Sequence, residues 1–286
     1  MAVRVEVQPS PRAWTTVPRA LVVALRPRQW VKNAVVVLCA VASAIYLVND
    51  VIDAPADRRH PVKRRRPIAA GLVPVPLALA TAGLLLAAGL GAAALLGPLF
   101  ALAVLAYLAV QVGYNLGLKR EPIVDIMCIA AGFVIRAIAG AVAVGVPVSG
   151  WFLLCVGLLA FYLGIEKRKA ELRTVEEGAA TRAVLRAYSL PLLLRMESVA
   201  TGGALLSYAL WAIDRGRSPW LLATLAFVAF GLFRYQLLTD RGEGEAPERA
   251  LLRSPHLVIA ILLWVVSCVV VLLLTQGPAP APRLFS

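Results

Sequence analysis

Long apolar runs separated by short polar connections dominate the chain. Each run is close to the roughly 20 residues that an α-helix needs to cross a bilayer, and few charges lie inside the runs. Because lipid leaves backbone groups to be satisfied within a helix, the pattern predicts an all-α integral membrane bundle of about eight spans. The runs are 34–52, 74–96, 99–116, 123–142, 150–165, 191–213, 219–238 and 256–275.

These runs predict one transmembrane domain over residues 26–275. Residues 1–25 lack an apolar core followed by a cleavage site, so they are expected to be a cytoplasmic lead-in rather than a signal peptide. The Pro- and Ala-rich stretch 276–286 is expected to be a disordered tail.

Composition narrows the class of protein further. Hydrophobic residues make up 60% of the 286 residues, and 29 basic residues against 16 acidic ones give a net charge of +13. The sequence shows no soluble domain in which aromatic residues alternate with basic ones, so nucleic acid is an unfavoured binding partner. The positive charge instead favours binding to anionic lipid or to a phosphorylated substrate. The four cysteines lie in apolar runs without paired spacing, which predicts neither disulfides nor a zinc site.

The basic residues are unevenly shared between the connections. Connections 58–66, 119–120, 166–190 and 239–254 are rich in Lys and Arg, whereas 97–98 and 143–150 carry no charge and 211–219 only three. The positive-inside rule therefore places the basic connections in the cytoplasm and predicts a multi-pass protein of the cell membrane.

The first run departs from this alternation, because basic segments flank it on both sides. The uncharged stretch from Ala34 to Val48 corresponds to about 22 Å of helix, less than the ~30 Å hydrocarbon core. Three interpretations stay open: the N-terminus lies on the opposite face, the segment is re-entrant, or a helix found in similar proteins is missing.

Three acidic residues end the first run. Asp50, Asp53 and Asp57 fall within about 60° of one another on a helix, although Pro55 would kink or end a regular helix there. Repulsion between such close carboxylates is relieved by a divalent cation, which predicts Mg²⁺ bound with a substrate's phosphates. The plainer alternative is a solvated helix end balanced by neighbouring arginines.

A basic segment follows these acids directly. It includes Lys63 and Arg66, and together with a metal it suits a diphosphate leaving group. By itself, such a segment would more simply set topology and face lipid headgroups. Its position next to the acids favours phosphate binding, at a site that faces the cytoplasm.

Two further charged patches end the third and fifth runs on the same side. Lys119, Lys167 and Arg168 are expected to hold phosphate oxygens, and Glu171 to assist a second metal or to act as a positioned base. Basic residues that flank a span only to set its topology are the alternative interpretation.

Two further charged residues, Asp125 and Arg136, lie within an apolar run, where a charged side chain usually faces the interior of the bundle. A lipid phosphate or a structural ion pair would satisfy the charge of Arg136.

The sequence NDVIDAPAD at 49–57 resembles the NDxxDxxxD motif of the UbiA superfamily of intramembrane prenyltransferases. More narrowly, a series of motifs over residues 24–275 is similar to the actinobacterial branch that transfers phosphoribose to decaprenyl phosphate. These motifs are RPRQWVKN at 26–33, YLVND at 46–50, HPVK at 60–63, RPIAAG at 66–71, RAIAG at 136–140 and KRKAEL at 167–172.

The resemblance implies transfer of 5-phosphoribose from phosphoribosyl diphosphate to a polyprenyl phosphate, for cell-wall arabinan precursors, and leaves room for a homo-oligomer. It implies Mg²⁺ on Asp50, Asp53 and Asp57, with the lipid tail between helices. The substrate-binding residues expected are Asn49, Lys63, Arg66, Tyr114, Lys119, Asp125, Arg136, Lys167, Arg168, Glu171, Arg28 and Lys32.

The chain also departs from the pattern of its relatives. Relatives have about nine helices, two of them between RPRQWxKN and NDxxD, where this chain has only one run; Glu166 stands where a glycine is expected. Two alternatives therefore remain beside the phosphoribosyl transferase: a polyprenyltransferase with an aromatic acceptor, and an inactive lipid-binding relative.

Overall fold

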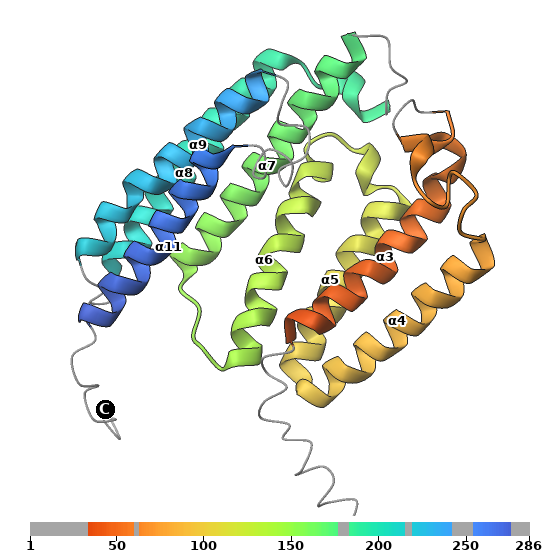
Figure 1. Ribbon diagram of the computed structural model, residues 1–286, viewed down its shortest axis with the longest axis horizontal. Helices are drawn as coiled ribbons and strands as arrows, with labels where there is room; N and C mark the ends of the chain where they lie inside the picture. Colours follow the sequence, from red (N-terminus) through yellow and green to blue (C-terminus); the bar gives the residue numbers. More distant parts are fainter. Residues whose placement is uncertain (1–33, 60–62, 177–182, 215–218, 242–253, 276–286) are drawn as a thin grey trace, which may run out of the picture.

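The computed structural model of the protein describes residues 34–59, 63–176, 183–214, 219–241 and 254–275. Arg28 and Lys32 lie outside these residues, as do the predicted lead-in and tail. Within the described residues every regular element is helical (Figure 1). The long helices are α3 (Ala34–Asp57), α4 (Val75–Leu96), α5 (Pro98–Leu116), α6 (Val124–Val144), α7 (Gly150–Glu176), α8 (Leu190–Ile213), α9 (Leu225–Asp240) and α11 (Pro255–Thr275).

Each of the eight predicted runs coincides with one of these helices, which confirms the all-α membrane fold. In the part of the chain that the structure describes, seven spans are long and apolar enough to cross a membrane, one of them formed by α9 with the short helix η6 (Pro219–Thr224). The remaining helix, α8, has 24 residues but carries Arg195 and Glu197. It nevertheless packs antiparallel along α7, since Cys155 contacts Ala204 and Lys169 contacts Glu197.

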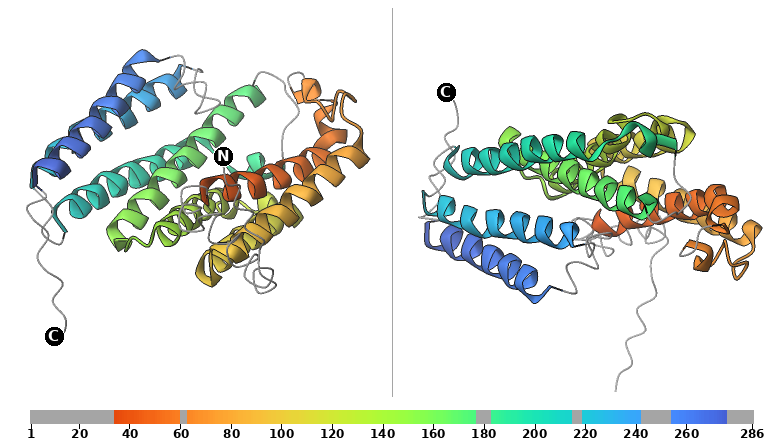
Figure 2. Two further views of the ribbon diagram at one scale, coloured as in Figure 1. Left: turned by 60° about the horizontal axis from the view of Figure 1, so that its bottom comes forward. Right: turned by 90° about the horizontal axis from the view of Figure 1, so that it is seen from above.

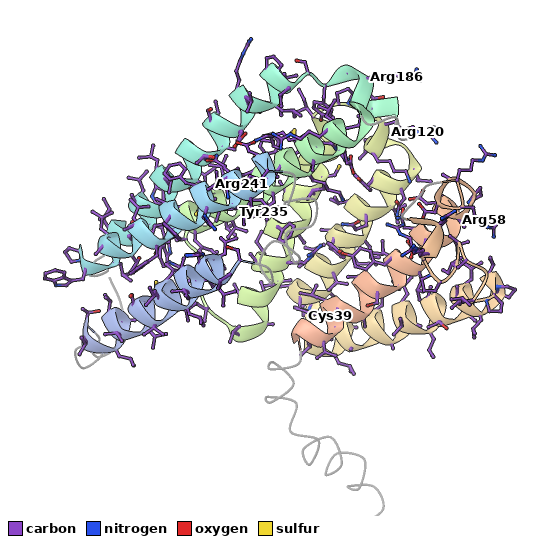
Figure 3. The ribbon with its side chains drawn as sticks, turned by 45° about the horizontal axis from the view of Figure 1, so that its top comes forward. Cys39, Arg58, Arg120, Arg186, Tyr235 and Arg241 are labelled. Carbon is purple, nitrogen blue, oxygen red and sulfur yellow. The ribbon has the colours of Figure 1, made fainter. Side chains whose placement is uncertain are left out.

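The helices run alternately up and down, so that α3, α5 and α7 end where α4, α6 and α8 begin (Figure 1). We call this the charged end of the bundle, because the basic connections lie there. Arg58, Arg120 and Arg186 mark it in Figure 3, and Cys39 lies toward the opposite end of α3. In Figure 2, α9 and α11 form a pair that is set apart from α7 and α8.

Close approach between neighbouring helices depends on small residues. A Cβ added at Gly89 of α4 would lie 2.6 Å from Cγ2 of Val41 on α3. A Cβ at Gly164 of α7 would lie 2.6 Å from Cγ2 of Ile126 on α6. Gly89 therefore permits the close packing of α4 on α3, and Gly164 that of α7 on α6.

Helix α3 settles part of the question about the first run. It is one continuous helix of 24 residues, about 36 Å long, because it continues past Val48 and through Pro55 to Asp57. The expectation of a run too short for one crossing is therefore wrong, and a re-entrant path is excluded for residues 34–57. The chain enters α3 at the end of the bundle opposite to Asp57 (Figure 1).

Candidate active site

The acidic face of α3 carries the predicted carboxylates at its last two turns. One nitrogen of Arg66, Nη1, lies 2.9 Å from Oδ1 of Asp50 and 2.8 Å from Oδ2 of Asp57. Asp53 instead pairs with Lys119, whose Nζ lies 3.2 Å from Oδ1 of Asp53. Asp57 is the most enclosed of the three, at 5% exposure. The structure therefore gathers the three acids with two basic residues.

The α3–α4 connection folds back over the end of α3 and brings Arg66 to these acids. It contains the short helix η2 (Lys63–Arg65) and a turn in which Leu72 and Val73 donate backbone hydrogen bonds to the carbonyl of Pro67. Ile68 is buried against Ala54 of α3 and Ala78 of α4. Arg66 precedes this anchor by two residues, so burial of Ile68 fixes the place of its guanidinium. Lys63 lies in η2, but its side chain is not among those described.

Lys119 comes from the short helix η3 (Leu118–Arg120), which follows the end of α5. Its side chain is 18% exposed, and the Asp53 side chain is 24% exposed. Tyr114, one turn earlier on α5, interacts electrostatically with Arg168 of α7. Asn49 lies on α3 directly before Asp50. The connections that follow α3, α5 and α7 thus meet at the charged end, as the sequence predicts.

Arg168 and Asp125 form a fully enclosed ion pair. Nε of Arg168 lies 2.6 Å from Oδ2 of Asp125, and neither side chain is exposed. Glu171 accepts a hydrogen bond from Nη1 of Arg168. The bonded atoms of Arg168 and Asp125 are enclosed, while Nη2 of Arg168 has no hydrogen-bond partner, and contact of either residue with substrate stays a prediction. The geometry makes the pair a link between α6 and α7.

Lys167, the residue before Arg168 on α7, differs from it in exposure. It is exposed, whereas the residues on both sides of it, Glu166 and Arg168, are fully buried. Of the three basic residues in KRKAEL, Lys167 is therefore the exposed one. Glu171 of the same motif is half-buried beside Arg168. Direct contact of Lys167 with a phosphate stays a prediction.

Arg136 lies deep in α6, about 16 Å along the helix from Asp125. Its Nη2 donates to the Tyr107 hydroxyl at 3.2 Å, and its guanidinium lies 5.0 and 4.9 Å from the ring centroids of Tyr107 and Phe133. Its Nε is buried without a hydrogen-bond partner. Among the described residues no carboxylate forms an ion pair with Arg136. The predicted structural ion pair is therefore not seen there.

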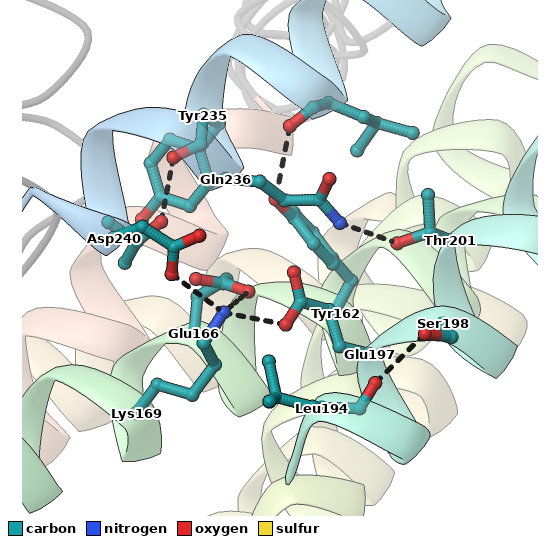
Figure 4. Close-up of polar contacts among 12 residues, drawn as sticks. Tyr162, Glu166, Lys169, Leu194, Glu197, Ser198, Thr201, Tyr235, Gln236 and Asp240 are labelled. Atoms are coloured by element: carbon teal, nitrogen blue, oxygen red, sulfur yellow. Dashed lines mark hydrogen bonds and ion pairs between the residues drawn. The ribbon is translucent and has the colours of Figure 1, made fainter. Parts of the chain in front are cut away.

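A second buried network on α7 was missed by the sequence reasoning (Figure 4). Nζ of Lys169 lies 3.2 Å from Oε1 of Glu166, 2.6 Å from Oε2 of Glu197 and 3.4 Å from Oδ1 of Asp240. Glu166 and Lys169 are at most 1% exposed. The signal in the sequence was Glu197, an acid inside an apolar run that needs a partner. The network joins α7, α8 and α9 near the charged end.

The residues of the acidic face fit a magnesium ion in part. Mg²⁺ needs only one or two protein carboxylates, with water and substrate phosphates completing its shell. The carboxylates of Asp50 and Asp57 both pair with Nη1 of Arg66. The position between the two carboxylates therefore favours a positive charge. Across the described ranges no three Asp, Glu, His or Cys side chains gather closely enough to hold a metal by themselves. The three-carboxylate magnesium site stays a prediction.

The fold and this site define an α-helical, multi-pass membrane protein with acidic and basic side chains gathered at one end of the bundle. The chain belongs to the UbiA prenyltransferase family, whose model matches residues 13–257. This confirms the family resemblance of the sequence motifs.

Curated relatives cover most of the chain. Decaprenyl-phosphate phosphoribosyltransferase of Corynebacterium glutamicum is 37% identical, over 86% of this chain and 84% of its own length. The Mycolicibacterium smegmatis protein of the same name is 35% identical, over 91% and 94%. The Mycobacterium tuberculosis protein of that name is 37% identical, over 86% and 91%.

Solved structures share the fold. A UbiA homolog from Archaeoglobus fulgidus bound to GPP and Mg²⁺ matches with a TM-score of 0.65 at 20% identity, covering 85% of this chain and 88% of that chain. The same homolog bound to DMAPP and Mg²⁺ matches with a TM-score of 0.62 at 18% identity, covering 85% and 87%. The arrangement of helices in the described residues is therefore that of the family.

Proposed function

We propose that this protein transfers 5-phosphoribose from phosphoribosyl diphosphate to a polyprenyl phosphate, decaprenyl phosphate in the first instance, and releases diphosphate. The observation that carries the proposal is the pairing of Asp50 and Asp57 with Arg66, and of Asp53 with Lys119, at one end of a membrane bundle. The names of the curated relatives support the choice of donor and acceptor.

The donor's diphosphate belongs at the acidic face of α3. When bound, Mg²⁺ would be held by Asp50 and Asp57, with Asp53 beside them, and would neutralise charge on the diphosphate. Arg66 and Lys119 are the cations that already face these acids, and each can turn to a phosphate oxygen as the diphosphate enters. Their role is to stabilise negative charge that grows on the leaving diphosphate.

The transfer itself makes one bond and breaks one. A phosphate oxygen of the lipid forms a bond to C1 of the ribose, while the bond from C1 to the diphosphate oxygen breaks and its electron pair leaves with the diphosphate. A lipid phosphate is already ionised near pH 7, so this chain need not supply a strong general base. The groups required are cations that hold the two anions, which the charged end provides.

Arg136 is suited to receive the acceptor phosphate from the membrane side. It is a cation within a membrane span, held between two aromatic rings, and it lacks a carboxylate partner among the described residues. Tyr107, its hydrogen-bond partner, lies on α5. Arg136 is therefore joined to α5, the helix that leads into η3 and Lys119.

An apolar cavity of about 690 Å³ offers space for part of the polyprenyl tail. It lies between α7, α8, α9 and α11 and is lined by apolar and aromatic side chains such as Leu159, Phe227 and Trp264. Such a lining suits an isoprenoid chain, which has no polar groups to satisfy.

Replacing Arg136 by methionine tests the acceptor site. We expect the KM for polyprenyl phosphate to rise about 10- to 100-fold, because a charge-assisted contact to phosphate is lost, with the KM for phosphoribosyl diphosphate unchanged. Steady-state kinetics with each substrate varied in turn measures both constants. Arg234→Met is the matched control, since Arg234 is a half-buried arginine of the α9 span. An equal rise of both constants in Arg136→Met would contradict the assignment.

We place the charged end in the cytoplasm of a cell-membrane protein. Its described connections carry Arg58, Arg64, Arg65, Arg120 and Lys119, whereas the connections at the opposite end around Gly97 and Gly145 carry no charge. Phosphoribosyl diphosphate, a soluble anion, would reach the site from this side. A role in cell-wall arabinan synthesis and a homo-oligomer stay predictions.

The proposed function is tested with purified protein in detergent, Mg²⁺, phosphoribosyl diphosphate and decaprenyl phosphate. We expect diphosphate release that needs all three, and transfer of labelled ribose to lipid. Release from polyprenyl diphosphate with an aromatic acceptor, independent of the sugar donor, would point to a prenyltransferase instead. No release, together with no Mg²⁺-dependent thermal shift by phosphoribosyl diphosphate, would point to a lipid-binding protein.

A further inference from the structure

The connection between α5 and α6 contains a strained residue. Ile123, directly before α6, has φ +70° and ψ −47°. Among the described residues it is the one non-glycine residue with positive φ. Such a conformation is rare, and for a β-branched side chain it is a strained outlier. Contacts from the surrounding structure must therefore hold Ile123 in place.

Tyr188 supplies such a contact from another part of the chain. Its hydroxyl accepts a hydrogen bond from the backbone N–H of Ile123 at 2.6 Å and donates one to Oδ1 of Asp125 at 2.6 Å. Tyr188 is 5% exposed and follows the short helix η4 (Ala183–Ala187). Burial and the hydrogen bond to Asp125 raise the pKa of the Tyr188 phenol above its usual range, so that it keeps the proton it donates.

Asp125 is itself fixed, which gives Tyr188 a rigid anchor. The other oxygen of Asp125 is bound by Nε of Arg168, and both side chains are fully enclosed. Tyr188 therefore connects a buried ion pair of α6 and α7 to the backbone of Ile123. The short helices η3 and η4, which precede these two residues, contact each other at the charged end; Arg120 and Arg186 mark them in Figure 3.

The same connection carries Lys119 to the acidic face. Lys119 lies four residues before Ile123, and its Nζ lies 3.2 Å from Oδ1 of Asp53. Backbone hydrogen bonds from Asp125 to Glu121 and from Glu121 to Leu118 join the two parts of the segment. Ile123 and Lys119 therefore belong to one short, hydrogen-bonded segment.

We propose that Tyr188 is a positioning residue for the donor site: its hydroxyl holds Ile123 in the strained conformation that keeps Lys119 against Asp53. Without this hydroxyl, Ile123 relaxes toward negative φ and Lys119 withdraws from the acidic face. The consequence for kinetics rests on the proposed function, because it takes Lys119 as a ligand of the donor's diphosphate. The consequence for the position of Lys119 does not.

The first test replaces Tyr188 by phenylalanine, which keeps the ring and removes the hydroxyl. We expect the reactivity of Lys119 toward an amine-labelling reagent, followed by mass spectrometry in the substrate-free protein, to rise about threefold or more. We expect the KM for phosphoribosyl diphosphate to rise about tenfold and kcat to fall, because Lys119 also stabilises the leaving diphosphate, with the KM for polyprenyl phosphate nearly unchanged. Ser207→Ala is the control, since Ser207 is an equally buried residue of α8 whose hydroxyl donates a hydrogen bond to the carbonyl of Ala204.

The second test restores the site by another route. Glycine adopts φ +70° without the steric penalty that isoleucine meets. We therefore expect Ile123→Gly, added to Tyr188→Phe, to return Lys119 labelling and the KM for phosphoribosyl diphosphate to within about twofold of the starting protein. A role limited to overall stability would not be rescued in this way.

The outcomes separate the two proposals. Unchanged Lys119 labelling in Tyr188→Phe, or a loss of activity that Ile123→Gly fails to restore, would overturn the role of Tyr188. A starting protein without transferase activity, in which labelling still responds to both substitutions, would overturn the proposed function and support the positioning role.

Discussion

Replacing Asp50 by asparagine should lower the rate of Mg²⁺-dependent diphosphate release by about 10²- to 10³-fold. The substitution keeps the shape of the side chain and removes one negative charge from the place where Arg66 joins Asp50 to Asp57. Loss of one electrostatic partner of a transition state has an effect of this size in other enzymes. Diphosphate released from phosphoribosyl diphosphate and polyprenyl phosphate is the quantity to measure.

The control for this prediction is Asp214→Asn. Asp214 caps the far end of α8, at the end of the bundle opposite to the acidic face, and accepts a hydrogen bond of 3.4 Å from Ser149. We expect activity within about twofold of the starting protein. Full activity in Asp50→Asn, with both proteins folded, would rule out the acidic face of α3 as the donor site.

Replacing Lys169 by methionine should lower the free energy of unfolding of the bundle by more than the replacement of a solvent-exposed charged residue does. Lys169 lies between the buried carboxylates of Glu166 and Glu197, so its removal leaves buried negative charge without a partner. Breaking a buried ion pair in this way costs about 3–5 kcal/mol. The midpoint of thermal unfolding in detergent should fall accordingly, because α7, α8 and α9 lose the contact that joins them.

Two variants make this result specific. Arg173→Met removes a more exposed cation beside Asp240, and we expect it to change stability by less than about 1 kcal/mol. Changing Glu166 and Glu197 to glutamine in the Lys169→Met protein should recover much of the loss, because no buried charge then lacks a partner. If Lys169→Met unfolds at the same temperature as the starting protein, the buried network does not hold these helices together.

Much of the fold could be predicted from the sequence, because the information is local. Eight apolar runs predict eight helices, and each helix forms where its run lies. Helical periodicity places Asp50, Asp53 and Asp57 on one face of α3, and the distribution of Lys and Arg identifies the charged end. These features depend on residues close together in the chain, so they need no knowledge of how the helices pack.

The pairing of charges could not be predicted in the same way. Arg66 was expected beside the acids, but its contact with both Asp50 and Asp57 depends on the fold of the α3–α4 connection. Arg168 was expected at a phosphate, yet packing of α6 against α7 encloses it with Asp125. Both outcomes depend on which side of a helix meets its neighbour, which the local pattern leaves open.

The sequence by itself therefore determined the membrane class, the helical spans and the residue types gathered at one end. Apolar length, helical period and charge distribution are sufficient for these conclusions. Only the tertiary structure decided that Lys119 meets Asp53, 66 residues away, and that Tyr188 reaches Ile123, 65 residues away. Such contacts arise when close packing of the helices brings distant connections together, and the strained backbone of Ile123 persists because that packing supports it.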